Sequence, residues 1–206
     1  MLRQAQHDKE RFWKNLKRIK FMKILPLIIA PDPLLKQVSK TVEKIDEALC
    51  QLMKDMVNTM YLEHGVGLAA VQVGVLKRVL VIDVDYEIED HQHHHHDHQG
   101  CGGIHVKNTN PRFFVNPQII ELSKESQSYN EGCLSFPDMR SEVVRPQKVK
   151  VKYLDYNGNE QVEEMTGLLA ICIQHEIDHL NGIVFVDHIS KLKRDVILNK
   201  MKKLRK

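Results

Sequence analysis

Two histidines and a glutamate form the pattern in this sequence that is best suited to metal chemistry. The string HEIDH places His175 and His179 four residues apart, so on a helix both imidazoles lie on one face, one turn apart. Both can then bind one metal ion at about 2.0–2.1 Å, with Glu176 beside them. The chain contains 12 histidines, so the alternative is a pair of structural histidines that flank a glutamate by chance.

A catalytic metal site also needs a third protein ligand and an open position for water. The longer zinc-protease pattern HExxHxxGxxH takes that ligand downstream, but this chain has Phe185 there and no glutamate after Glu176. Asp187 and His188 are weak downstream candidates. Upstream, Cys133 in NEGCLSFP offers a thiolate. A lone cysteine is more often an inert core residue, but beside HExxH and a glycine-rich segment the ligand role is favoured.

The helix that carries these histidines is predicted to begin at a Thr166 cap and to end at Gly182. One stripe of this helix, at i, i+3, i+4, i+7 and i+11, consists of Leu168, Ile171, Cys172, His175 and His179. Asp178 is a candidate partner for the second nitrogen of a ligand histidine, or else an exposed helix residue.

Other segments predict the elements that position this helix. Apolar runs predict strands at residues 79–84, 113–116 and 149–156, and Asn157-Gly158 predicts a two-residue hairpin. Asp46 is a predicted cap for a helix that runs to about residue 64 and buries a face rich in methionine. We therefore expect an α+β fold with mixed, mostly antiparallel sheets packed around the central HExxH helix.

A C-terminal helix dense in lysine and arginine is also expected. Its predicted apolar face consists of Ile189, Leu192, Val196, Met201 and Leu204.

Length and composition indicate one domain. A chain of 206 residues with 42% hydrophobic residues can bury one ordinary core, which we expect to comprise residues 22–206. Residues 1–21 hold seven Lys or Arg and two acids, and are expected to be an extension outside the fold. A His-rich insertion at about residues 87–110 is expected to be a solvated loop, although its histidines and Cys101 could bind a transition metal.

Compartment and partners are only weakly constrained by composition. No secretory signal peptide precedes the four cysteines, so reduced thiols in a cytoplasmic protein are expected. The apolar stretch at residues 24–30 is interrupted by Pro26 and is far shorter than the roughly 20 residues that cross a bilayer, so no membrane partner is expected. A net charge of +3 gives no strong general attraction to nucleic acid, and no DNA partner is expected.

Three motifs in this sequence resemble those of the peptide deformylase family. They are GVGLAAVQ at residues 65–72, EGCLS at residues 131–135 and QHEIDH at residues 174–179. The resemblance runs from about Met22 to the C-terminus and includes PDPLL. It implies removal of the formyl group from the N-terminal formyl-methionine of newly synthesised proteins, with release of formate.

The resemblance also implies roles for individual residues. Cys133, His175 and His179 would bind one divalent metal ion, usually Fe(II) in this family, with Zn(II), Ni(II) and Co(II) as other ions that accept these ligands. Glu176 would be the general base. The oxyanion would be stabilised by the Gln72 side-chain amide and the Leu134 backbone N–H.

By the same resemblance, the substrate peptide lies as an added strand along Gly67. The family's methionine pocket corresponds here to Val66, Tyr129, Leu168, Ile171 and Cys172, with Arg140 at its rim. The expected partners are N-formylmethionyl nascent peptides. The basic C-terminal helix either docks on the ribosome near the nascent chain or is only a solvated face.

Two rival functions are weighed against this one. A metallopeptidase of another class would cleave internal peptide bonds, but it needs the downstream ligand that this chain lacks. A non-enzymatic metal-storage protein built around the His-rich segment and the four cysteines would bind several metal ions per chain.

Overall fold

The computed structural model describes residues 23–88 and 106–204. The predicted extension at residues 1–21 and most of the His-rich insertion therefore lie outside the described residues. Two short strands, β3 (Glu87–Ile88) and β4 (Val106–Lys107), pair where the insertion begins and ends. None of the helices within these two ranges is long and apolar enough to cross a bilayer.

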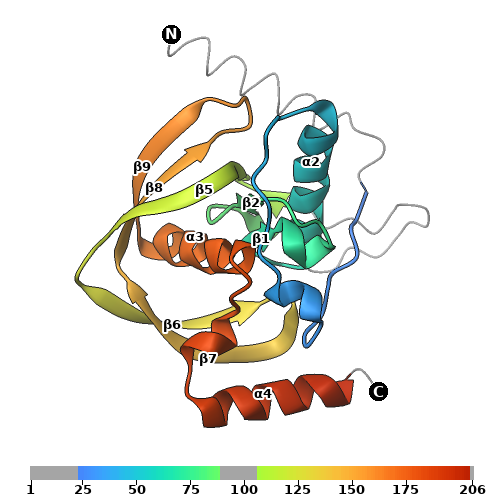
Figure 1. Ribbon diagram of the computed structural model, residues 1–206, viewed down its shortest axis with the longest axis vertical. Helices are drawn as coiled ribbons and strands as arrows, with labels where there is room; N and C mark the ends of the chain where they lie inside the picture. The colour runs from blue at the N-terminus through green and yellow to red at the C-terminus, as the bar shows by residue number, and fades with distance from the viewer. Residues whose placement is uncertain (1–22, 89–105, 205–206) are drawn as a thin grey trace, which may run out of the picture.

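A five-stranded antiparallel sheet forms the frame of the fold (Figure 1). Its spatial order is β1-β2-β5-β8-β9. The strands are β1 (Gly67–Ala69), β2 (Val79–Ile82), β5 (Arg112–Leu122), β8 (Lys148–Leu154) and β9 (Glu160–Thr166). All four strand pairings are antiparallel, in line with the predicted fold class.

Helices cover both faces of this sheet near β2. Alternate residues of a strand point to opposite faces. Leu80 and Ile82 pack in the same apolar cluster as α3 (Gly167–Leu180). Val79 and Val81 pack in the cluster of α2 (Glu47–Leu62). Because β2 is covered on both faces, all four of its residues are buried and its sequence reads as a continuous apolar run.

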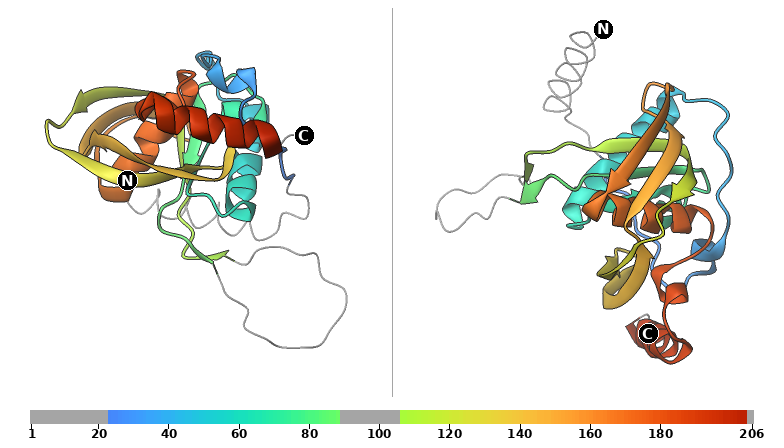
Figure 2. Two further views of the ribbon diagram at one scale, coloured as in Figure 1. Left: turned by 90° about the horizontal axis from the view of Figure 1, so that it is seen from below. Right: turned by 90° about the vertical axis from the view of Figure 1, so that its left-hand side faces the viewer.

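The α3 helix lies between the five-stranded sheet and a second, two-stranded sheet (Figures 1 and 2). That second sheet pairs β6 (Ser126–Cys133) with β7 (Phe136–Pro146). Ten of the 14 residues of α3 are buried, so this helix is covered on nearly every side and its histidines lie in the interior.

The ends of α3 agree with the sequence prediction. Thr166 is the N-cap residue, although its side chain makes no capping hydrogen bond. Gly182 follows the last turn with a φ of +73°, in the left-handed conformation that favours glycine. A Cβ on Gly182 would also lie 2.4 Å from the Lys36 carbonyl oxygen. Glycine is therefore required here by conformation and by space, and it allows the chain to pack against the 3-10 helix η1 (Pro33–Lys36).

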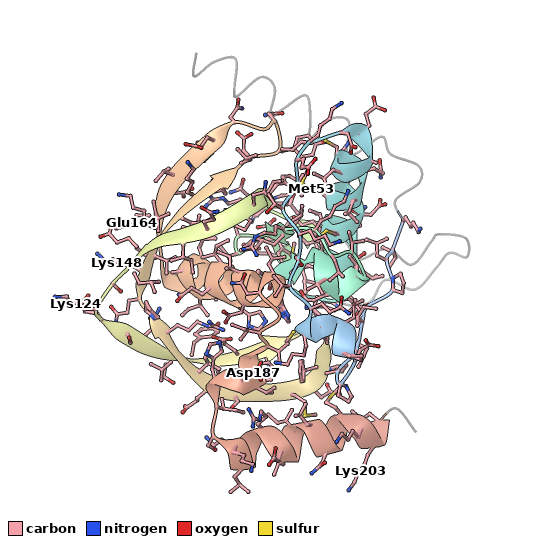
Figure 3. All side chains as sticks on the ribbon, in the orientation of Figure 1. Met53, Lys124, Lys148, Glu164, Asp187 and Lys203 are labelled. Carbon is pink, nitrogen blue, oxygen red and sulfur yellow. The ribbon has the colours of Figure 1, made fainter. Side chains whose placement is uncertain are left out.

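The prediction for α2 is confirmed. Asp46 is its N-cap and accepts a 2.8 Å hydrogen bond from the Leu49 N–H. Met53, Met56 and Met60 are fully buried and pack in the apolar cluster between α2 and the sheet. Met53 is labelled in Figure 3.

The predicted apolar face of the C-terminal helix is largely wrong. Leu192, Val196 and Leu204 of α4 (Lys191–Leu204) are exposed, whereas Ile197 and Met201 are buried. These two residues join the apolar cluster that contains Met139 and Val143 of β7, with Ile189 and Leu198 at its edge. The cluster that Phe185 and Val186 form with β7 selects the buried face of α4, and the spacing within α4 could not identify that cluster.

Two strand predictions need correction. The strand at residues 113–116 does not stop before Pro117: β5 continues to Leu122, and its pairing with β8 shifts register between Val115 and Gln118. A bulge at this point tolerates the missing proline N–H. The β8–β9 hairpin has a five-residue loop at residues 155–159 instead of two, because the Asp155 side chain accepts hydrogen bonds from two backbone N–H groups in the loop.

We predict that Gly182→Ala lowers the free energy of unfolding by more than about 2 kcal/mol, because it adds a backbone clash to an unfavourable left-handed φ. The matched control is Gly158→Ala, where φ is +82° but the nearest atom to the new Cβ is Ile45 Cδ1 at 3.7 Å. That variant should lose about 1–2 kcal/mol. Urea unfolding of both variants measures the difference, and equal losses would contradict the close packing at Gly182.

Candidate active site

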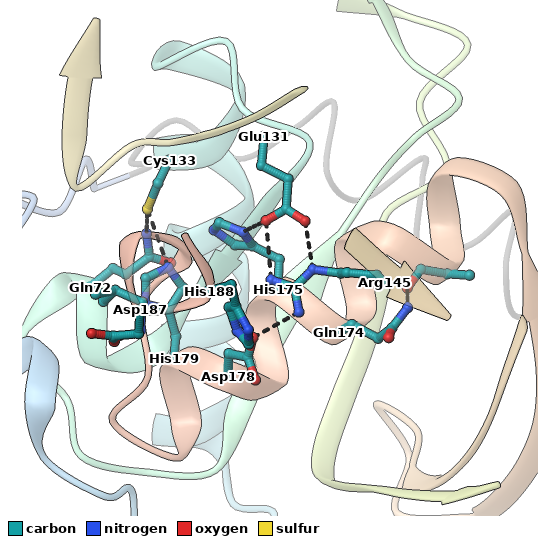
Figure 4. Close-up of polar contacts among 12 residues, drawn as sticks. Gln72, Glu131, Cys133, Arg145, Gln174, His175, Asp178, His179, Asp187 and His188 are labelled. Atoms are coloured by element: carbon teal, nitrogen blue, oxygen red, sulfur yellow. Dashed lines mark hydrogen bonds and ion pairs between the residues drawn. The ribbon is translucent and has the colours of Figure 1, made fainter. Parts of the chain in front are cut away.

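The structure brings the three sequence-predicted ligands together. The ligand atoms of Cys133, His175 and His179 all lie within 4.8 Å of one another, a group that could hold a metal ion. Cys133 Sγ lies 3.2 Å from His179 Nε2 (Figure 4). The two histidines come from consecutive turns of α3, and the cysteine comes from the end of β6. Two imidazoles and a thiolate are ligands typical of zinc and related divalent ions.

Glu131 holds the ring of His175. His175 Nδ1 lies 2.8 Å from Glu131 Oε2, so Nε2 is the nitrogen left for a metal ion. Burial opposes a charge on His175, but hydrogen bonds to Cys133 and Glu131 raise its pKa well above the ordinary value. Burial and the neighbouring His175 lower the pKa of His179 well below its usual range, which keeps that imidazole neutral, as a metal ligand must be.

A buried arginine, Arg145, holds Glu131 in turn. Arg145 Nε donates to Glu131 Oε1 at 2.5 Å, and Arg145 Nη1 donates to Asp178 Oδ2 at 2.8 Å. Despite burial, the hydrogen bonds from His175 and Arg145 hold the pKa of Glu131 at about 2. His188 Nε2 lies 2.7 Å from the same Asp178 oxygen, at the exposed end of the network.

These contacts correct one prediction and reveal residues that sequence analysis missed. Asp178 contacts Arg145 and His188 and makes no hydrogen bond to a ligand histidine, so its predicted role as a histidine partner is wrong. Glu131 has that role. The only sequence signal for it was its place in EGCLS, two residues before Cys133, and Arg145 had no signal at all.

The downstream ligand candidates are occupied elsewhere. Phe185 is buried in the apolar cluster beneath α4. Asp187 pairs with Lys36, and His188 pairs with Asp178. The described part of the chain therefore supplies no downstream third ligand of the zinc-protease kind.

Glu176 lies in the interior beside the three candidate ligands. Its side chain is buried, and Oε2 has no hydrogen-bond partner among the residues that the structure describes. Burial raises the pKa of Glu176 to about 7. A Cβ on Gly67 would lie 2.5 Å from Glu176 Oε1, so the absence of a side chain at Gly67 makes room for this carboxylate. The structure thus gives Gly67 a packing role beyond the predicted substrate contact.

Gln72 has a fixed orientation. Its Oε1 accepts a 2.8 Å hydrogen bond from the Ala69 N–H, which turns Nε2 toward Ser135 Oγ at 3.2 Å and Cys133 Sγ at 3.4 Å. The side-chain N–H groups of Gln72 therefore point at the candidate metal site.

A cavity of about 550 Å³ opens beside these groups. Its lining includes the sequence-predicted substrate and oxyanion residues Val66, Gly67, Gln72, Tyr129, Leu134, Arg140, Leu168, Ile171 and Cys172, together with Cys133, His175 and Glu176. Ile171 and Cys172 are buried, whereas Tyr129 is 44% exposed. The predicted pocket residues thus divide into an interior wall and a rim.

Together the fold and the site define an α+β protein with a candidate metal centre on a buried helix, beside a cavity large enough for a peptide side chain. The sequence pattern of the polypeptide deformylase family matches residues 24–195, and this chain belongs to that family. Membership makes the chain a hydrolase that deformylates polypeptides during protein synthesis.

Several peptide deformylases are similar to this chain in sequence or structure over most of its length. A peptide deformylase of Mesorhizobium japonicum is 50% identical over 185 residues, which cover 90% of this chain and 95% of that protein. One from Brucella suis is 50% identical over 183 residues, covering 89% of this chain and 94% of the relative. The crystal structure of peptide deformylase from Ehrlichia chaffeensis is 43% identical, with a TM-score of 0.76 and coverage of 89% of this chain and 97% of that one. A second structure of that enzyme, 42% identical with a TM-score of 0.75 and coverage of 89% and 98%, is in complex with actinonin.

We predict that Arg145→Met lowers the free energy of unfolding by about 3–5 kcal/mol, because it leaves the buried Glu131 and the partly buried Asp178 without their shared cation. Lys36→Met is the matched control, since it breaks an ion pair in which the lysine side chain is 50% exposed. It should cost no more than about 1 kcal/mol. Chemical unfolding at neutral pH measures both, and similar losses would contradict a structural role for the buried network.

We predict that Gly67→Ala lowers the rate of deformylation by about 100-fold while bound metal stays unchanged. The new Cβ displaces the Glu176 carboxylate, and a displacement near 1 Å can cost that much. Steady-state formate release and metal analysis of the same sample test this. Normal turnover in the variant would show that Glu176 tolerates the displacement.

Proposed function

We propose that this chain hydrolyses the formyl group of N-terminal formyl-methionine in newly synthesised proteins, using water activated by one divalent metal ion, and releases formate. The observation that carries the proposal is the convergence of Cys133, His175 and His179 within 4.8 Å, beside a buried Glu176 whose Oε2 has no hydrogen-bond partner among the described residues. Family membership supports the reaction type.

The donor set fits a divalent transition metal ion. In the proposal, His175 Nε2, His179 Nε2 and the Cys133 thiolate hold the ion, while Glu131 keeps the His175 ring in place. The bound ion would lower the pKa of a water molecule and polarise the formyl oxygen. Fe(II) is the ion that we propose in the cell, with Zn(II), Ni(II) or Co(II) as ions that the same ligands accept.

Glu176 is proposed to move the proton. Its carboxylate accepts a proton from the attacking water as the oxygen bonds to the formyl carbon, and then donates that proton to the leaving nitrogen as the C–N bond breaks. The products are formate and a free N-terminal amine.

The oxyanion needs hydrogen-bond donors that are already in position. We propose the Gln72 Nε2 group and the Leu134 backbone N–H for this role. The hydrogen bond from Ala69 to Gln72 Oε1 supports it, because it fixes which end of the amide faces Cys133.

The substrate is proposed to lie along the edge strand β1. Val66 C=O accepts a hydrogen bond from the N–H of Asp83, the residue that follows β2, and Gly67 pairs with Ile82. The backbone groups of Gly67 therefore point away from β2. They are free to pair with a peptide strand. The methionine side chain would enter the cavity between Ile171, Cys172 and the rim residues Val66, Tyr129, Leu168 and Arg140.

The proposed partners and location follow the same function. N-formylmethionyl nascent chains are the substrates, and the cytoplasm is the proposed compartment. The outer surface of α4 carries exposed lysines, of which Lys203 projects away from the rest of the molecule (Figure 3). We propose that this surface contacts ribosomal RNA near the nascent chain.

Two substitutions at the site should affect metal content and turnover differently. Glu176→Gln keeps the size of the side chain but cannot accept a proton, so turnover should fall by about 100-fold or more with about one metal ion retained per chain. Cys133→Ala removes a ligand, so metal and activity should both be lost on dialysis. Metal content and formate release from a formyl-methionyl tripeptide are measured on each variant.

The matched control is Cys50→Ala, since Cys50 is also partly exposed but lies on α2 among the residues that cover the sheet. It should keep both metal and turnover. A Cys133→Ala protein with stoichiometric metal and normal turnover would refute the third ligand.

A further inference from the structure

Residues 63–66 form one wall of the cavity, and their backbone is held by groups outside it. Val66 C=O accepts a 3.0 Å hydrogen bond from the Asp83 N–H. The carbonyl of Gly65 accepts a 3.0 Å hydrogen bond from the Tyr86 hydroxyl. Tyr86 itself does not line the cavity. The wall therefore depends on the segment that follows β2, at the point where the His-rich insertion begins.

That segment is tightly organised around one buried carboxylate. Asp83 is 1% exposed and accepts three hydrogen bonds. Its donors are the Tyr61 hydroxyl at 2.5 Å and the backbone N–H groups of Asp85 at 3.0 Å and Asn110 at 2.7 Å. These bonds join the end of α2 to the connection between β2 and β3 and to the connection between β4 and β5, and they fix the turn that presents Tyr86.

Tyr86 is also fixed through its ring. The Tyr61 and Tyr86 ring centroids are 4.7 Å apart with a tilt of 56°. Burial, and then the charge of Asp83, raises the pKa of Tyr86 above its ordinary value. The hydroxyl therefore keeps its proton and can donate it to Gly65.

The position of residues 63–66 affects the substrate site because they lead directly into Gly67, the first residue of the edge strand β1. Backbone groups of alternate residues in an edge strand point to opposite sides. The Val66 carbonyl points toward the β2 side and accepts from the Asp83 N–H, whereas the Ala69 N–H points away from β2 and donates to Gln72 Oε1. Gly67 lies between them in the same outward register as Ala69. A shift of Gly65 would move this edge, two residues before the position where a peptide would pair.

We propose that Tyr86 is a positioning residue for the peptide that follows the formyl-methionine. Acting through the Gly65 carbonyl, it holds residues 63–66 so that the Gly67 edge matches an extended substrate. This inference rests on the proposed function, and it makes recognition of the peptide beyond its first residue depend on the segment that bears the insertion.

The test is Tyr86→Phe, which removes the hydroxyl and keeps the ring against Tyr61. Two substrates are compared: formyl-Met-Ala-Ser, and formyl-methionine amide, which has no residue after the methionine. We expect KM for the tripeptide to rise about 3- to 10-fold, the effect of losing one hydrogen bond, with kcat within about twofold. KM for formyl-methionine amide should not change. A purely structural role would not separate the two substrates.

Tyr153→Phe is the matched control. Its hydroxyl also has polar partners, Arg112 and Glu163, but it lies in the five-stranded sheet outside the cavity lining. KM and kcat for both substrates should equal those of the parent chain.

Direct binding gives a second readout that does not require turnover. In a Glu176→Gln background, the Kd of formyl-Met-Ala-Ser should rise by the same 3- to 10-fold factor when Tyr86→Phe is added. An unchanged tripeptide KM and Kd, or an equal change for both substrates, would overturn the inference. Failure of the parent chain to release formate would instead refute the proposed function, while the Kd comparison would still decide the role of Tyr86.

Discussion

The buried ion pair between Glu131 and Arg145 is the interaction on which the rest of the site depends. It joins β6 to β7, and both partners also contact α3: Glu131 through His175, and Arg145 through Asp178. Charged groups are costly to bury unless each is paired and hydrogen-bonded, so this network has few alternative arrangements. It fixes the two-stranded sheet against the helix, and Cys133 follows Glu131 by two residues on that sheet. The distance between the thiol and the imidazoles is therefore set by charge pairing as well as by packing.

On the side of the site that faces β1, burial and close packing set the arrangement. Cover on nearly every side removes α3 from water, which lowers the pKa of His179 and raises that of Glu176. Residues that approach this helix from β1 and from the turn that follows it must then be small or hydrogen-bonded. Gly67 has no side chain where the Glu176 carboxylate lies, and Gln72 is bound at its oxygen end by Ala69. The Glu176 Oε2 atom has no hydrogen-bond partner among the described residues, which suits the proton transfer that we propose for it.

The sequence predicted those parts of this arrangement that local spacing determines. The ends of α3 and the cap of α2 depend on residues within a turn or two, and the three candidate ligands stand in short motifs. Local spacing could not predict contacts between segments that lie far apart in the sequence. The buried face of α4 was predicted wrongly because a cluster of Phe185, Val186 and residues of β7 selects it. Asp178 was given the wrong partner because Arg145 lies 33 positions away. Tyr86 and Gly65 meet across 21 positions, and no periodicity marks such a pair.

X-ray absorption at the metal edge tests the proposed metal centre most directly, measured on the full chain after loading with one equivalent of Zn(II) or Co(II). If Cys133, His175 and His179 bind the ion, the first coordination sphere contains one sulfur at about 2.3 Å and two imidazole nitrogens at about 2.0–2.1 Å, with oxygen from water in the remaining position. A sphere made only of nitrogen and oxygen donors would place the ion elsewhere in the chain and would contradict the proposed centre.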